Sequence, residues 1–363
     1  CWCRFCPSWC HIYMFSCFTK VCEVRIVIAP DSFTGTLTAA QAALAIKTGW
    51  EKTSKDDFFL APMSDGGPGF LDAISYGFGG NLVSYLVTDL EGNAIKVPML
   101  IVGKTAYIES HLIVGPQLIT KFPKTPDKYT SKGIGELINK AISEGCESIF
   151  VGVGGTASID GGVGILETVN PKDLENIDLV AATDVDVLLL GNRGAAKGFG
   201  EQKGASKELI EELEKKLEAL AKKTPKRKDN KDASLMLGAG AGGGIGFALM
   251  ALGATRVSGL ELVEESFDLK NEITNSDLVI TGEGSLDWQT LRGKVITGIA
   301  DLAMESAKTC LALCGQVVAG KRELAAAGIV GAYGCIEPGQ DLPEDPFMSL
   351  VMLAERVSRT WSK

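Results

Sequence analysis

Histidine is scarce in this sequence: its 363 residues contain only two, His11 and His111. Catalysis by a serine–histidine–aspartate triad therefore has one candidate in the body of the chain, His111, whose apolar surroundings are typical of a buried structural histidine. Positive charge is also in short supply, because 36 Lys and Arg face 45 Asp and Glu and leave a formal net charge of −9. An acidic chain without a long basic stripe is a poor nucleic-acid binder.

Long uncharged apolar runs are absent after residue 25, so the sequence there predicts no membrane span, which needs about 18 such residues. Hydrophobic residues make up 45% and charged residues 22%, which is typical of a globular protein and excludes disorder for most of the chain. At about 150 residues per domain, the length predicts two domains.

Cysteine is unevenly distributed, because six of the ten lie in the first 22 residues. The spacing of Cys3, Cys6, Cys10 and His11 permits a zinc site but lacks the paired CxxC-like knuckles of structural zinc sites. We expect residues 1–24 to be a Cys-rich extension outside the fold. The other four cysteines, scattered among apolar residues, predict buried thiols in a reduced, cytoplasmic protein: Cys146, Cys310, Cys314 and Cys335.

Familiar nucleotide-binding motifs are missing or incomplete. Before Gly293-Lys294, Trp288 occupies the position of the first Walker A glycine, and the protein-kinase motifs are absent. The glycines of 238–243 satisfy the dinucleotide pattern GxGxxG, and residues 234–237 before them predict a short strand. One such match among 43 glycines is not specific, so a dinucleotide-dependent enzyme is kept only as an alternative.

Short apolar runs of strand length alternate with segments of helical periodicity. This alternation predicts an α/β fold with mainly parallel sheets. The predicted strands are 25–30, 58–63, 106–109, 148–153, 179–183, 277–281, 309–314 and 329–333. The predicted helices are 38–50, capped by Thr36 or Thr38, and 133–144, 207–223, 244–252 and 297–306.

Acidic residues and glycines gather at the ends of the predicted strands. Asp31, Asp65 and Asp184 each end a strand, and the glycine-rich segments 154–156 and 282–284 end two more. In open α/β sheets, ligands bind beyond the carboxyl ends of the strands. The pattern therefore predicts a single acidic, glycine-lined crevice.

The residue types at these ends suit phosphoryl transfer. Glycines let backbone N–H groups approach phosphate oxygens closely, and carboxylates hold Mg²⁺ or take a proton from an attacking hydroxyl. Lys203 and Lys294, each beside a glycine, would supply positive charge.

Several stretches together carry a family resemblance. They are 28–33 (IAPDSF), 64–67 (SDGG), 152–164 (GVGGTASIDGGVG), 191–205, 238–246 and 280–284 (ITGEG), the last with Asp287, Gln289, Thr290, Gly293 and Lys294. With these stretches in this order, the chain from Arg25 to its end resembles the bacterial-type (type 2) glycerate kinases. Each motif is short, and the specificity lies in the set.

The resemblance implies two α/β domains with the active site in the cleft between them. A flavodoxin-like domain would combine both chain ends, 25–75 and 290–363, around an inserted middle domain, 76–289. It also implies an ATP- and Mg²⁺-dependent kinase that phosphorylates D-glycerate at the 2-hydroxyl, giving 2-phosphoglycerate. Small molecules, and neither nucleic acid nor membrane, are then the expected partners. The sequence leaves the oligomeric state open, a homodimer included.

The resemblance and the strand-end pattern assign candidate roles. Asp184 or Asp65 would be the base or a Mg²⁺ ligand near the glycerate hydroxyl, and Lys203 and Lys294 would stabilise transferred charge. Predicted metal ligands are Glu283 and Asp287. Predicted substrate or nucleotide contacts are Asp31, Ser32, Gly66, Gly67, Gly154, Gly155, Thr156, Asp160, Gly282 and Gly284, with Asp160 holding either its loop or a metal.

Ordinary structural roles stay open for the same residues. A turn is the alternative role for Asp65 and Glu283, and a helix cap is the alternative for Asp287. For Asp31 the alternative is a cap or a turn, and for either lysine it is a solvated surface position. Five positions also depart from the family's motifs: Thr34, Pro68, Phe70, Val187 and Glu201. Several are polar-to-apolar changes beside predicted site loops. A weakened relative that binds a nucleotide or a small acid without turnover is therefore a second alternative.

Overall fold

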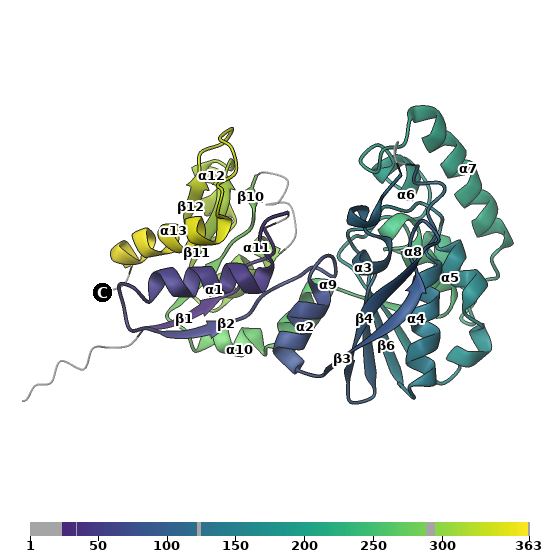
Figure 1. The fold of residues 1–363 in the computed structure, drawn as a ribbon, viewed down its shortest axis with the longest axis horizontal. Helices are drawn as coiled ribbons and strands as arrows, with labels where there is room; N and C mark the ends of the chain where they lie inside the picture. Colours follow the sequence, from purple (N-terminus) through teal and green to yellow (C-terminus); the bar gives the residue numbers. More distant parts are fainter. Residues whose placement is uncertain (1–23, 34, 122–124, 288–294, 362–363) are drawn as a thin grey trace, which may run out of the picture.

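The computed structural model describes residues 24–33, 35–121, 125–287 and 295–361. Residues 1–23 of the predicted extension, Thr34 and Lys294 lie outside these described residues. Val24, the last residue of that predicted extension, is part of the fold, because it packs against a core of the first sheet and its carbonyl oxygen accepts the Asp57 N–H at 2.9 Å. The chain forms two β-sheets, each covered by helices, as Figure 1 shows. The predicted α/β fold is thereby confirmed. Within the described residues, no helix is both long and apolar enough to cross a membrane.

The first sheet combines both ends of the described chain. Its strands pair in the order β10-β11-β9-β1-β2, with β12 also on β11, and all pairs are parallel. Parallel strands buried on both faces are expected to be continuously apolar, as these mostly are. The bounds are β1 Arg25–Ile28, β2 Asp57–Leu60, β9 Leu278–Thr281, β10 Ser285–Leu286, β11 Thr309–Val317 and β12 Ile329–Ile336.

Successive side chains along β1 pack into two different cores, one on each face of this sheet. Ile26 and Ile28 pack with helices α1 (Ala39–Trp50) and α13 (Pro346–Trp361), whereas Val27 between them belongs to the core on the opposite face. The reason is that successive side chains of a β-strand point to opposite faces of the sheet. Thr38 caps α1 as predicted, its hydroxyl accepting the Gln41 N–H at 3.2 Å. The opposite core contains α11 (Val295–Glu305) and residues of α10 (Leu269–Thr274) and α12 (Lys321–Ala326).

The second sheet is mixed. Strands β3 to β5 are antiparallel, and β5 to β8 continue in parallel in chain order. Its strands are β3 Asn81–Thr88, β4 Ala94–Val102, β5 Thr105–Glu109, β6 Ser148–Gly152, β7 Asp178–Ala182 and β8 Thr255–Val257. Its helices are α3 His111–Val114, α4 Lys132–Ser143, α5 Val163–Thr168, α6 Ala195–Phe199, α7 Lys207–Lys223 and α8 Ile245–Ala251.

The sequence analysis missed the hairpin β3–β4. Most of β3 is exposed, so its pattern lacks the buried run that marks the other strands. The predicted strand at 234–237 was wrong, because Ala233–Leu235 forms a 3₁₀ turn. The physical reason is Asp232, whose side chain accepts the Ser234 N–H at 2.9 Å and caps that turn.

Two helices connect the sheets. Figure 1 shows α2 (Phe70–Phe78) and α9 (Gly259–Ser266) between them. The helices touch so closely that a Cβ on Gly77 would lie 2.3 Å from the hydroxyl oxygen of Ser266. One buried core includes side chains from these helices and from both sheets, among them Phe70, Tyr107 and Val279.

The sheet pairing bears on the predicted domain boundaries. Residues 76–289 were assigned to the middle domain, yet β9 and β10 within that range pair in the first sheet. In the structure the second sheet ends with β8, and the chain returns to the first sheet through α9 and α10. The exact division into domains stays a prediction.

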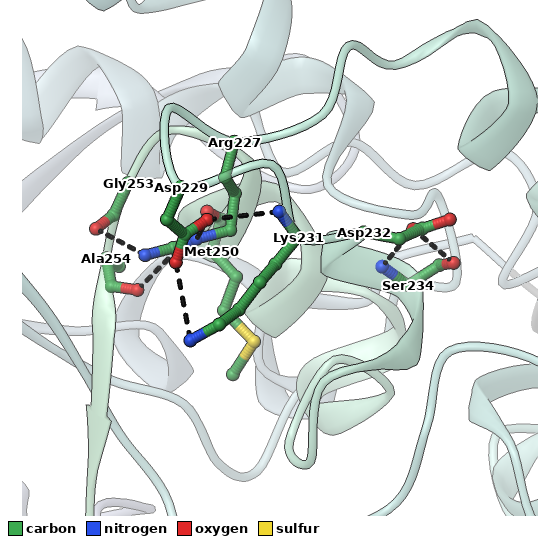
Figure 2. A network of polar contacts seen from close by, with 8 residues as sticks. All are labelled: Arg227, Asp229, Lys231, Asp232, Ser234, Met250, Gly253 and Ala254. Atoms are coloured by element: carbon green, nitrogen blue, oxygen red, sulfur yellow. Dashed lines mark hydrogen bonds and ion pairs between the residues drawn. The ribbon is translucent and has the colours of Figure 1, made fainter.

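A basic loop after α7 is tied to the end of α8. The Arg227 guanidinium donates to the carbonyl oxygens of Met250 at 2.5 Å and Ala254 at 2.8 Å (Figure 2). It also donates to Gly253 at 3.3 Å. Because the last carbonyls of a helix lack partners within it, this cation caps α8.

Candidate active site

One cavity collects many of the predicted site residues. We call it the Lys203 cavity; its volume is about 480 Å³. It lies where loops follow β2, β6 and β7, as the strand-end rule predicts. The predicted residues that line it are Asp65, Gly67, Gly154, Gly155, Thr156, Asp184 and Lys203.

Asp184 directly follows the loop residue Thr183 at the end of β7 and is half-buried. Its Oδ1 accepts the Ser258 hydroxyl at 2.5 Å, and its Oδ2 accepts the Leu260 N–H at 3.1 Å. Burial raises the pKa of the Asp184 carboxyl, and the negative charge of Asp65 acts in the same direction. The two hydrogen bonds and the nearby Arg256 oppose that rise without cancelling it.

Asp65 lines the same cavity from the loop after β2. Its Oδ1 accepts the Gly67 N–H at 3.2 Å, which is the turn geometry that a structural role would require. The turn does not exclude a second role, because a carboxylate can accept several hydrogen bonds or bind a cation at the same time.

Among the described residues that line the cavity, Lys203 is the cation. Its Nζ donates to the Thr156 hydroxyl at 3.0 Å and to the Ser158 carbonyl oxygen at 2.9 Å. Burial lowers the pKa of the ammonium to about 7, against the opposing influence of Asp160. The predicted alternative of a solvated surface lysine does not describe this side chain, which is half-buried and directed to the cavity wall.

The site glycines serve close packing between loops. A Cβ on Gly154 would lie 2.6 Å from the Gly67 Cα, and one on Gly66 would lie 2.7 Å from the Ala182 carbonyl oxygen. Gly66 also has a φ of +89°, which favours glycine. These glycines therefore let the loops after β2, β6 and β7 meet. Their predicted contact with phosphate stays a prediction.

Asp160 holds its own loop, which is one of its two predicted roles. Its Oδ2 accepts the Ser131 N–H at 2.8 Å and the Ser131 hydroxyl at 2.7 Å. Its Oδ1 accepts the Gly162 N–H at 2.9 Å. The carboxylate thus ties the loop after β6 to the start of α4, and it does not line the Lys203 cavity.

A second cavity corrects the prediction of a single crevice. We call it the Asp31 cavity; its volume is about 380 Å³, and it lies at the carboxyl ends of strands in the first sheet. The predicted residues that line it are Asp31, Ser32, Glu283 and Gly284. The strand ends separate into two groups because the chain builds two sheets, and only strands of one sheet share an edge.

Two other predicted residues near the first sheet, Gly282 and Asp287, do not line the Asp31 cavity. Gly282 lies beneath it, where its carbonyl oxygen accepts the Asp31 N–H at 2.8 Å and an added Cβ would meet the Leu313 carbonyl oxygen at 1.9 Å. Asp287 is described but lines neither cavity. The predicted pairing of Glu283 with Asp287 at a metal stays a prediction.

The carboxylates of the Lys203 cavity suit a magnesium ion that arrives with a nucleotide. Mg²⁺ is usually held by one or two carboxylates together with phosphate oxygens and water. Asp65 and Asp184 line one cavity and repel each other, and a divalent cation would relieve that repulsion. Among the described residues, no group of three or more His, Cys, Asp or Glu could hold a metal by itself.

Glu109 is a functional candidate that the sequence analysis missed. It is 3% exposed at the end of β5, and it accepts the Gly69 N–H at 3.1 Å and the Leu71 N–H at 3.0 Å. Burial raises its pKa to about 7. It ends a predicted strand, so the same strand-end rule could have found it. Through these bonds it anchors the start of α2 beside the Asp65 loop.

Ser258 was missed as well, and no motif pointed to it. It precedes α9, and its partner Asp184 lies 74 positions earlier in the chain. Only the parallel pairing of β7 with β8 brings the two together.

The family departures have different surroundings. Pro68 lines the Lys203 cavity, whereas Phe70 is fully buried in the core beside Tyr107. The Val187 carbonyl oxygen accepts the Gly238 and Gly240 N–H groups. Glu201 is exposed. Of these four, Pro68 is therefore the change that directly alters the cavity wall.

The structure does not support the alternative of a dinucleotide-dependent enzyme at residues 238–243. The GxGxxG fingerprint acts at a turn between a strand and a helix. Here a 3₁₀ turn, Ala233–Leu235, stands where that strand should be.

The sequence and the fold were compared with known protein families, relatives and solved structures. The model of the glycerate kinase family matches residues 26–172 and 168–362. A glycerate 2-kinase of Escherichia coli is 35% identical over 327 residues, covering 81% of this chain and 86% of the relative. A glycerate kinase of Bacillus subtilis is 30% identical over 371 residues, covering 93% and 96%. The crystal structure of a putative glycerate kinase 2 from Salmonella typhimurium matches with a TM-score of 0.75 at 30% identity, covering 93% of this chain and 98% of that one. The chain belongs to the glycerate kinase family and is a kinase.

Proposed function

We propose that this kinase transfers the γ-phosphoryl group of ATP to the 2-hydroxyl of D-glycerate, with Mg²⁺ as the accompanying ion. The observation that carries the proposal is the Lys203 cavity, where two carboxylates and a lysine line one space. Phosphoryl transfer needs an acceptor for the hydroxyl proton and positive charge near the phosphoryl oxygens. The choice of the 2-hydroxyl is supported by the similar E. coli protein, named glycerate 2-kinase.

Asp184 takes the proton of the attacking hydroxyl in this proposal. A raised pKa makes its carboxylate a stronger base than an exposed aspartate. Its two oxygens are held by Ser258 and Leu260, so the group is oriented before substrate binds.

Lys203 stabilises the negative charge of the phosphoryl group. Burial lowers the pKa of its ammonium, whose two hydrogen-bond partners are neutral oxygens. An anionic substrate raises the pKa of a nearby lysine, so substrate binding favours the charged form needed for transfer.

Mg²⁺ would neutralise phosphate oxygens of the bound nucleotide. Asp65, lying beside Asp184 in the cavity, is the carboxylate that we assign to hold it. In the Asp31 cavity, we assign Asp31, Ser32 and Gly284 to substrate or nucleotide binding.

A coupled ADP-release assay with ATP, Mg²⁺ and D-glycerate tests the activity, run with the full chain and with residues 1–24 removed. We expect turnover that chelation of Mg²⁺ abolishes, and a product identified by NMR as 2-phosphoglycerate. Binding of glycerate and nucleotide without turnover would refute the kinase proposal and favour the weakened relative, for which Pro68 in the cavity wall is the specific observation. A 3-phosphoglycerate product would refute the 2-hydroxyl.

Replacing Asp184 tests the assigned base. Asp184→Asn keeps the size of the side chain and should lower kcat by about 10²- to 10⁴-fold. The matched control is Asp186→Asn, because Asp186 is exposed two residues further on and does not line the cavity. Near-normal kcat in Asp184→Asn, with the control also normal, would remove Asp184 from the mechanism.

A further inference from the structure

Both oxygens of Asp184 are held by the start of one helix. The Ser258 hydroxyl contacts Oδ1 at 2.5 Å, and the Leu260 N–H contacts Oδ2 at 3.1 Å. Ser258 is the N-cap of α9, and Leu260 lies in its first turn. Both hydrogen bonds that hold the carboxylate in the cavity wall thus come from the start of α9.

The direction of the Ser258 hydrogen bond follows from its second contact. The Ser258 Oγ accepts the Glu261 N–H at 3.1 Å, as an N-cap does. The only proton on the hydroxyl is therefore directed to Asp184, since an ionised carboxylate has no proton to donate. This is a charge-assisted hydrogen bond, which is stronger than one between neutral groups.

The charges near Asp184 do not replace that bond. Asp65 and Glu264 both interact with it as like charges, and Arg256 is the cation that attracts it. Arg256 is itself held through its Nε, which donates to the Thr183 carbonyl oxygen at 3.2 Å. A carboxylate released from Ser258 would keep only the Leu260 N–H as a hydrogen-bond partner, and the nearby acids would still oppose its charge.

The turn that contains Ser258 is closely packed against its neighbours. The next residue, Gly259, packs against the Asp65 loop, where an added Cβ would lie 2.3 Å from the Asp65 carbonyl oxygen. Further along α9, Leu262 and Val263 are buried in the core that includes side chains of the first sheet. The position of the hydroxyl is therefore set by packing between the two sheets.

We propose that Ser258 is a positioning residue of the transfer reaction: its hydroxyl fixes the Asp184 carboxylate in the orientation that faces the acceptor hydroxyl. The inference rests on the proposed function. It assigns to α9 a part in catalysis in addition to its part in joining the sheets. Loss of the bond should affect the reaction step more than the binding of either substrate.

The kinetic test compares Ser258→Ala with Ser258→Thr. We expect Ser258→Ala to lower kcat by about 10- to 100-fold, as a misplaced reacting group does, while KM for D-glycerate and ATP changes by less than about threefold. Ser258→Thr keeps a hydroxyl and should restore most of kcat. Asn170→Ala is the matched control, because Asn170 also caps a short helix through one backbone N–H but contacts no site carboxylate.

A double-mutant cycle separates positioning from general stability. In an Asp184→Asn background, Ser258→Ala should add little further loss of kcat, because the group that it orients is already disabled. Additive losses, an equal loss in Ser258→Thr, or a kcat near the wild-type value in Ser258→Ala would each overturn the proposal.

A crystal structure of Ser258→Ala gives a readout that does not depend on turnover. We expect the Asp184 side chain in a second rotamer or divided between two. An unchanged carboxylate would overturn the proposal even if the wild type proved inactive. Conversely, a wild type without turnover, together with a displaced Asp184 in Ser258→Ala, would refute the kinase activity alone.

Discussion

The Nζ of Lys203 lies 3.0 Å from the hydroxyl oxygen of Thr156, in the wall of a cavity that also contains two carboxylates. Its other close partner, the Ser158 carbonyl oxygen at 2.9 Å, is neutral as well. Burial of this cation costs folding free energy, which the negative charge of Asp160 offsets only in part. We therefore propose that Lys203 meets an anion in function.

Lys203→Met should lower kcat/KM by about 10²- to 10³-fold, because the variant keeps the length of the side chain and loses its charge. The fold should persist, since methionine removes an unfavourably buried charge. Steady-state kinetics and thermal unfolding check both statements. Lys197→Met is the matched control, because Lys197 on α6 pairs with Glu211 at 3.1 Å and does not line the cavity. Equal effects of the two substitutions would contradict the assignment.

The pH dependence of kcat/KM should show the titration of Lys203. Its pKa of about 7 means that the ammonium loses its charge as the pH rises through 7, well below the range of an exposed lysine. We therefore expect kcat/KM to fall above about pH 7, since this parameter reports groups of the free enzyme. A profile that stays flat to pH 9 would show that the charge on Lys203 is not required.

Stability should depend on pH through Glu109. Its pKa in the fold is about 7, above the ordinary value of 4.5, so the folded state binds more protons than the unfolded state between these values. The free energy of unfolding contributed by this group is present in full below pH 4.5 and is lost as the pH rises towards 7. The free energy of unfolding of the wild type, measured with urea, should therefore exceed that of Glu109→Gln by more at pH 5 than at pH 8.

Glu175→Gln serves as the control for that measurement, because Glu175 is exposed and belongs to neither cavity. Its stability relative to wild type should change little between pH 5 and pH 8. If the stability of Glu109→Gln relative to wild type is equally independent of pH, the raised pKa of Glu109 is contradicted.

Gly154→Ala should destabilise the protein by about 1–3 kcal/mol, because the new Cβ meets the Gly67 backbone at 2.6 Å. Activity should fall as well, since the displaced loop carries Thr156. Gly320→Ala is the matched control, because its Cβ would meet the flexible Glu323 side chain at an ordinary 3.4 Å. Chemical denaturation of both variants gives the comparison, and equal losses would argue against close packing at Gly154.

Strand positions were predictable wherever both faces of a strand are covered. The predicted strands 25–30 and 277–281 contain the apolar runs 26–30 and 278–280, and both contain strands of the first sheet. The hairpin β3–β4 was not predicted, because β3 is largely exposed and lacks such a run. The apolar pattern at 234–237 is too short to distinguish a strand from a turn. Asp232 caps a 3₁₀ turn there, and no strand forms.

The sequence by itself determined the α/β architecture, the family, and the acids and glycines that end the strands, because these depend on local periodicity and on short motifs. Tertiary structure decided which of them meet. Pairing into two sheets divided one predicted crevice into two cavities, and placed β9 with the chain ends. It also brought Ser258 to Asp184 across 74 positions, since a contact between distant segments follows from strand order and leaves no pattern in either segment.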